Sequence, residues 1–172
     1  MPLTPATPDD IAEVSRQLGR PARDIVAIAA RCVCGRPTVV QTKPRLADGT
    51  PFPTVYYLTH PAATAALSTL EAGGLMVQYQ DRLAEDAEFA AAYQRAHEAY
   101  IADRDAVAEA EHLPAVTEIA GISAGGMPTR VKCLHALAGH ALAAGPGVNP
   151  VGDLALEACS WKPSVCACAT SN

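Results

Sequence analysis

The sequence has few aromatic residues, few charged residues and no long apolar run. Only 5% of its 172 residues are aromatic and 18% are charged, whereas 49% are hydrophobic, a composition typical of a packed globule. A membrane-spanning helix needs about 20 consecutive apolar residues, and no segment provides them. Residues 1–5 have neither the basic nor the apolar segment of a secretory signal. We therefore expect a globular cytoplasmic protein that does not associate with a membrane.

Basic residues are also scarce, 13 against 18 acidic ones, so the formal net charge is −5. A nucleic-acid-binding domain usually presents a basic face, and this balance argues against one. The acidic residues concentrate in the middle of the chain, because residues 71–118 contain eleven of them. Residues 81–111 are expected to present an acidic helical face to solvent, with His97 and His112 at the surface.

A chain of this length typically forms one domain, which can bury roughly 70% of the surface of the extended chain. We expect a single domain over residues 1–172, with a core over about 8–158. The remaining residues, 159–172, are interpreted as a variable C-terminal tail.

Turn-forming and β-branched residues predict a small sheet followed by helices. Three segments of high strand propensity follow one another with Gly- and Pro-containing turns between them, which predicts a three-stranded antiparallel meander. These segments are residues 25–32, 38–42 and 54–59. Apolar periodicity and capping residues predict about five helices, over residues 8–18, 61–72, 88–110, 129–144 and 153–159. The fold class is therefore α+β, a small sheet covered by helices.

The six cysteines include no Cys-x-x-Cys pair of the kind that zinc knuckles use. Cys32 and Cys34 are two residues apart at the end of the first expected strand, so their side chains face the same side. His60 follows the third strand, which runs in the same direction as the first. We expect these three residues to meet at one end of the sheet and to bind zinc or an iron–sulfur centre, because sulfur and imidazole suit both.

Cys133 is the preferred fourth metal ligand, since it stands near the start of an expected helix, and His135 is the second choice. The other three cysteines lie in the tail, which is expected to fray, and are not assigned to the site: Cys159, Cys166 and Cys168. An alternative interpretation is that all of these are buried free thiols and ordinary histidines.

Cys133 also suits a different role, that of a catalytic nucleophile with His135 or His140 as its base. A closed-site metal ligand cannot serve as a nucleophile, so the two interpretations exclude each other. The string Gly121-x-Ser123-x-Gly125 matches the nucleophile elbow of the α/β-hydrolases. However, the chain is shorter than such folds, and no histidine follows Asp153.

Residues 121–132 form a glycine-rich segment that leads into an expected helix. Free backbone N–H groups at a helix start bind anions, and two cations in the first turn are unfavourable there unless an anion arrives. We therefore expect a pocket for a small anionic ligand, lined by Ser123, Gly125, Gly126, Arg130 and Lys132, and further by Arg31 and Arg45. The alternative is a simple turn whose cations pair with the acidic helix.

Four stretches are long enough to be specific: Arg31-Cys32-x-Cys34-Gly35-x-Pro37, residues 44–59, residues 121–135, and residues 145–153. They resemble the domain of unknown function 501 family, over roughly residues 8–158. The resemblance implies a bacterial, cytoplasmic protein without an established activity. In that family the position of His60 is often cysteine, an exchange that a zinc ligand tolerates. Genes of the family often neighbour those for enolase, a septum-formation initiator and an exopolyphosphatase-like protein.

Three hypotheses for function follow. The first is a metal centre at Cys32, Cys34, His60 and Cys133 next to a cationic, anion-binding pocket. The second is an enzyme that acts on a phosphorylated or carboxylated small molecule through Cys133 or a metal-bound water. The third is a division-linked adaptor whose acidic face, residues 81–111, binds a basic protein partner.

Overall fold

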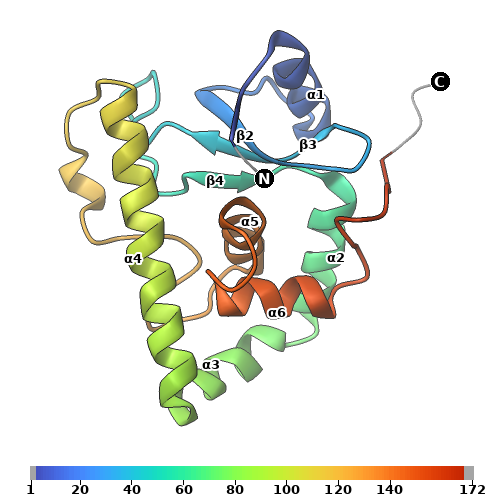
Figure 1. Ribbon diagram of the computed structural model, residues 1–172, viewed down its shortest axis with the longest axis vertical. Coiled ribbons are helices and arrows are strands. Elements are labelled where there is room, and N and C mark those ends of the chain that lie inside the picture. The colour runs from blue at the N-terminus through green and yellow to red at the C-terminus, as the bar shows by residue number, and fades with distance from the viewer. Residues whose placement is uncertain (1–2, 169–172) are drawn as a thin grey trace.

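The computed structural model describes residues 3–168 and shows a small antiparallel sheet with helices on both faces (Figure 1). The strands are β1 (Thr4–Pro5), β2 (Ile25–Arg31), β3 (Pro37–Thr42) and β4 (Tyr56–Leu58). The helices are α1 (Pro8–Leu18), α2 (Pro61–Ala72), α3 (Leu75–Glu85), α4 (Ala87–Ala110), α5 (Leu134–Ala144) and α6 (Pro150–Ala158), with a short 3₁₀ helix, η1 (Thr117–Ile119). The predicted α+β class is confirmed.

The sheet contains the predicted meander and one additional edge strand. Its strand order is β1-β2-β3-β4, and every pair is antiparallel. The register pairs Ile28 with Val40 and Val39 with Leu58. The short β1 was not predicted, because two residues with a proline carry almost no strand signal. The described residues therefore form four strands rather than three.

The helices differ from the prediction at two places, and the described residues form six α-helices rather than about five. Helix α3 is additional: Gly74 has φ 82°, which ends α2 and lets a new helix start in another direction. Helix α5 begins at Leu134 and not directly after Pro128. Before it the chain folds back on itself, with Lys132 N–H donating to the Gly125 carbonyl at 2.7 Å.

Each face of the sheet packs against a different helix. Helix α1 covers one face through a small cluster of Val14, Ile28 and Val40. Helix α5 lies against the other face, at the centre of the larger core, with α2, α4 and α6 around it (Figure 1). Gly139 allows this close approach, because a Cβ there would already lie 3.4 Å from the Tyr56 carbonyl oxygen.

Tyrosines of the long helix α4 fix the loops that surround the core. The Tyr100 hydroxyl accepts from the Val55 N–H at 2.8 Å, and the Tyr93 hydroxyl donates to the Arg130 carbonyl at 2.9 Å. His97 lies on the same helix and is only 9% exposed, so its predicted surface position is wrong. Among the described residues, no helix combines the length and apolar character needed to cross a membrane.

Candidate metal centre

The first two cysteines lie in the tight hairpin between β2 and β3. Cys32 N–H donates to the Arg36 carbonyl, and Gly35 N–H donates to the Cys32 carbonyl, each at 2.8 Å. Gly35 has φ 89°, a left-handed conformation that closes this turn without strain. The predicted strand end at Cys32 is wrong by one residue, because β2 ends at Arg31, and it is the turn that brings the Cys32 and Cys34 sulfurs within 4.8 Å of each other.

The C-terminal segment brings two more cysteines to this hairpin. After α6 the chain continues past the buried Trp161 and runs beside α2 to the hairpin (Figure 1). The sulfur atoms of Cys32, Cys34, Cys166 and Cys168 all lie within 4.8 Å of one another. The Cys34 and Cys168 sulfurs are 3.5 Å apart. Two Cys-x-Cys pairs from distant parts of the chain thus form one four-sulfur group.

The surroundings favour ionisation of the exposed Cys34 thiol and oppose ionisation of the more buried Cys32 and Cys168 thiols. The Arg36 backbone N–H, hydrogen-bonded to Cys34, lowers the pKa of Cys34 to about 7. Burial raises the pKa of Cys32 and that of Cys168. A divalent cation at the centre of the group would stabilise all four thiolates and offset half of their charge.

His60 lies beside this group, and its hydrogen bonds determine its role. It caps α2, where its Nδ1 accepts from the Ala63 N–H at 3.4 Å. A neutral imidazole that accepts at Nδ1 carries its proton on Nε2. That Nε2 is 3.2 Å from the Cys168 sulfur, so the ring donates to the sulfur. The structure thus brings His60 to the cysteines, as predicted, but as a hydrogen-bond donor to the Cys168 sulfur.

Cys133, the predicted fourth ligand, lies at the start of α5 in a separate group with Glu71 and His135. The sequence shows Cys166-x-Cys168 as plainly as Cys32-x-Cys34, and this repeated spacing is the signal that could have identified the second pair. The expectation that the tail frays concealed it. The end of that tail, residues 169–172, lies outside the described residues.

The ionisable side chains around Cys133 change one another's pKa. Burial by itself would raise the pKa of Cys133, but its hydrogen bonds with His135 and the Ala136 backbone N–H outweigh burial and lower it. Hydrogen bonding with Cys133 is the main cause that raises the pKa of His135 to about 9, and Glu71 adds to it. The lowered pKa of Cys133 and the raised pKa of His135 both favour a thiolate–imidazolium pair, the arrangement predicted for a reactive Cys133.

The cations predicted to line an anion pocket are spread over the molecule. Arg31 forms a two-pronged ion pair with Asp10, with N–O distances of 2.6 and 2.9 Å. Arg45 pairs with Glu118 through one nitrogen, Nη2, which donates to both carboxylate oxygens, at 2.8 and 3.0 Å. The remaining two, Arg130 and Lys132, are exposed in the loop before α5, not in its first turn.

The glycines and serine of the predicted pocket have packing partners of their own. A Cβ on Gly125 would lie 2.6 Å from the Leu137 side chain, and one on Gly126 would lie 2.6 Å from the Arg130 carbonyl oxygen. The Ser123 hydroxyl is 2.8 Å from His97 Nδ1, and Ser123 is only 5% exposed. These residues therefore shape the loop before α5.

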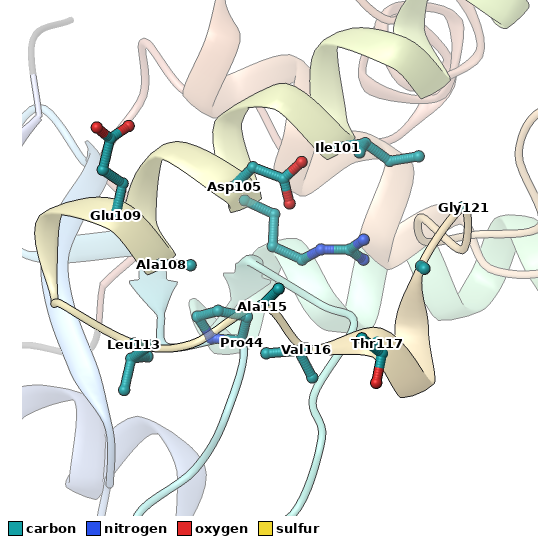
Figure 2. A pocket seen from close by; sticks show the side chains of 12 residues that line it. Pro44, Ile101, Asp105, Ala108, Glu109, Leu113, Ala115, Val116, Thr117 and Gly121 are labelled. Carbon is teal, nitrogen blue, oxygen red and sulfur yellow. The ribbon is translucent and has the colours of Figure 1, made fainter.

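A pocket of about 520 Å³ lies elsewhere, between α4 and the 113–121 loop (Figure 2). The pocket is lined by apolar side chains together with Arg104, Asp105 and Glu109, and its lining contains no cysteine. Arg104 is 3% exposed and donates to the carbonyls of Ile119 and Ile122. These bonds hold the loop against α4.

Comparison with known proteins gives one family. A search of curated proteins and a search of solved structures each gave no significant match. A family model described as "Protein of unknown function (DUF501)" matches residues 28–157. The matched region includes Cys32, Cys34 and Cys133, and it ends before Cys166 and Cys168. The chain therefore belongs to this family of unknown function, as the sequence resemblance predicted.

Proposed function

We propose that the protein binds one zinc-class metal ion through Cys32, Cys34, Cys166 and Cys168. The ion fastens the C-terminal segment to the β2–β3 hairpin, as a structural metal centre. The observation that carries the proposal is the convergence of two Cys-x-Cys pairs, whose four sulfurs lie within 4.8 Å of one another. Four thiolates form a closed set of the kind that structural zinc sites use.

The spacing of the sulfurs favours a single ion. A Zn–S bond of about 2.3 Å gives a tetrahedron with edges of about 3.8 Å. The Cys34–Cys168 separation of 3.5 Å is close to that edge. An iron–sulfur cluster places several irons and bridging sulfides between its cysteines, and this widens the set of thiolates. The compact group therefore supports zinc over a cluster.

Hydrogen bonds to the sulfurs also support metal ligation. The backbone N–H groups of Cys34 and Arg36 act to lower the pKa of the Cys32 and Cys34 thiols, respectively. The His60 ring adds a donor to Cys168. Such outer partners orient thiolate ligands and reduce the charge on them. Thiolate ligands must also stay reduced, which accords with the cytoplasmic location expected from the sequence.

The C-terminal segment has little else to hold it in place. Residues 162–167 are exposed, and Val165 is 61% exposed. Trp161 alone in this stretch is buried, with its ring 5.4 Å from the His60 ring. Burial of apolar surface usually holds a segment in place, and these residues bury little of it. A metal ion that links the segment to the hairpin can supply the missing stabilisation.

Elemental analysis of untagged protein, purified under reducing conditions and dialysed, tests the proposal. About one equivalent of zinc is expected to remain bound. The double variant Cys166→Ser, Cys168→Ser removes two ligands and should lower metal affinity by at least about 100-fold. Trp161 is the single tryptophan of the chain. Its emission should shift to longer wavelength when a chelator removes the ion.

Cys159→Ser is the matched control. The Cys159 sulfur donates only to carbonyls, those of Trp161 at 3.1 Å and Leu156 at 3.5 Å, and a serine hydroxyl can do the same. This variant should therefore retain its zinc. Less than about a tenth of an equivalent of metal after reduction and zinc addition would contradict the proposal. Iron with acid-labile sulfide in place of zinc would contradict the choice of ion.

A further inference from the structure

Glu71, Cys133 and His135 form a second group of potential ligands, separate from the four cysteines. Glu71 lies in the last turn of α2, and Cys133 is the N-cap residue of α5. One ligand atom from each of the three residues lies within 4.8 Å of the others. All three are partly exposed, so the group is open to solvent.

The hydrogen bonds of His135 leave one nitrogen directed at this group. Its Nε2 is 3.1 Å from the Thr64 carbonyl oxygen, which can only accept, so Nε2 carries a proton. Its Nδ1 faces Glu71 Oε1 at 3.1 Å. Metal-ligating histidines typically donate their other ring N–H to a backbone carbonyl, which fixes the tautomer and the ring orientation.

Backbone donors also act on the other two side chains. Leu134 N–H donates to Glu71 Oε1 at 2.7 Å, and the Ala136 backbone N–H lowers the pKa of the Cys133 thiol. Both N–H groups belong to the first turn of α5, whose free N–H groups stabilise negative charge. A carboxylate, a thiol of lowered pKa and an imidazole therefore lie together before any ion binds.

We propose that Glu71, Cys133 and His135 are a second metal site, which takes a zinc-class divalent ion with three protein ligands. Zinc bonds to nitrogen and oxygen of about 2.0–2.1 Å give a tetrahedron edge of about 3.3 Å. The observed Nδ1–Oε1 distance is 3.1 Å. One carboxylate and one thiolate neutralise a divalent cation, so no net charge is left in a half-buried place.

Three protein ligands leave a fourth position for water or a small anion. Zinc sites of this composition keep such an open position, whereas structural sites are closed by four protein ligands. The second site is accordingly weaker and exchangeable, and its ion is lost on dialysis that the four-cysteine site withstands. The proposal does not depend on the four-cysteine site.

Cobalt titration of the dialysed protein tests the second site. A further equivalent of Co²⁺ should bind, with the near-ultraviolet absorption of a single thiolate–cobalt bond. Cys133→Ser and His135→Gln should each abolish that absorption, and Glu71→Gln should weaken binding by at least about tenfold. His112→Asn is the matched control, because His112 is exposed and Asn tolerates its φ of 53°.

A second measurement uses the unaltered chain, so it does not depend on whether a variant folds. Added Zn²⁺ should slow the alkylation of Cys133 by iodoacetamide by at least tenfold, as followed by peptide mass spectrometry. Rapid alkylation of Cys133 that Zn²⁺ leaves unchanged, without a further equivalent of Co²⁺, would overturn the metal assignment. That result would identify Cys133 as a free reactive thiol.

Discussion

His140 is a fully buried imidazole whose surroundings keep it neutral. Its ring stacks on Tyr56 with centroids 5.9 Å apart, and meets Tyr100 edge-on at 5.0 Å. Asn149 lies 3.1 Å from its Nδ1. Burial lowers the pKa of His140 to about 4. Because no described residue provides a charge to compensate an imidazolium, protonation of this ring opposes folding.

The lowered pKa of His140 predicts how the free energy of unfolding depends on pH. The unfolded chain binds a proton at His140 near its ordinary pKa of about 6.5, and the folded chain binds it only near pH 4. The contribution of the neutral His140 ring to the free energy of unfolding is therefore fully present above pH 6.5, and it is lost as the pH falls from 6.5 towards 4. The slope contributed by His140 approaches about 1.4 kcal/mol per pH unit at most.

His140→Phe should remove this contribution while it keeps most of the ring packing. The free energy of unfolding, measured by urea denaturation, should fall less steeply between pH 7 and 5 in the variant than in the parent. Metal loss at acid pH affects both proteins, so the difference isolates His140. Equal slopes in the two proteins would show that the ring is protonated without cost.

At the scale of the elements, α5 and α6 pack closely together, and Gly152 permits this contact. A Cβ placed on Gly152 would lie 2.2 Å from the Leu137 carbonyl oxygen and 2.8 Å from the Ala141 Cβ. Backbone and helix side chains cannot move out of the way as an exposed side chain can. Gly152 is therefore required by the packing of the two helices.

Gly152→Ala should destabilise the protein by about 1–3 kcal/mol, because the two helices must separate. Gly73→Ala is the matched control: its φ is −79°, and its Cβ would lie 3.4 Å from the nearest atom. That control should change stability by less than about 1 kcal/mol in either direction. Denaturant midpoints of both variants decide the matter, and equal midpoints would contradict the packing argument.

Element by element, the sequence predicted helices best where local signals are strong. Thr7 and Asp10 form a reciprocal capping box at the start of α1, and Gly19 ends that helix, as their positions indicated. The start of α5 was not predicted, since backbone bonds from the loop 125–132 determine it. These hydrogen bonds form only when the loop packs against Leu137 and Tyr93.

At the scale of the whole molecule, the four-cysteine group joins the β2–β3 hairpin to the C-terminal end of the described chain. Cys34 and Cys168 are 134 residues apart in sequence. The large core rests on α4 and α5, where Tyr93, Tyr100 and Leu137 are fully buried. Loss of the proposed ion should therefore release the tail and leave the core folded.

Hydrogen–deuterium exchange of zinc-loaded and chelated protein checks this expectation. Residues 160–168 and the β2–β3 hairpin should exchange faster after chelation, whereas peptides from α4 and α5 should not change. A melting temperature about 5–10 °C lower is expected if the ion contributes about 2.7 kcal/mol, as a ligand present at 100 times its Kd would. Uniform acceleration over the whole chain would instead show that the ion supports the core.

The sequence by itself determined the features that depend on neighbouring residues. The meander and the capped helices follow from propensities and capping within a few positions. Only the tertiary structure decided which groups meet. Cys166 and Cys168 reach the hairpin because α6 and Trp161 direct the tail there, and Cys133 meets Glu71 because α2 and α5 pack together. Contacts between distant segments depend on how helices and strands pack together, and the spacing of residues within a short segment does not predict that packing.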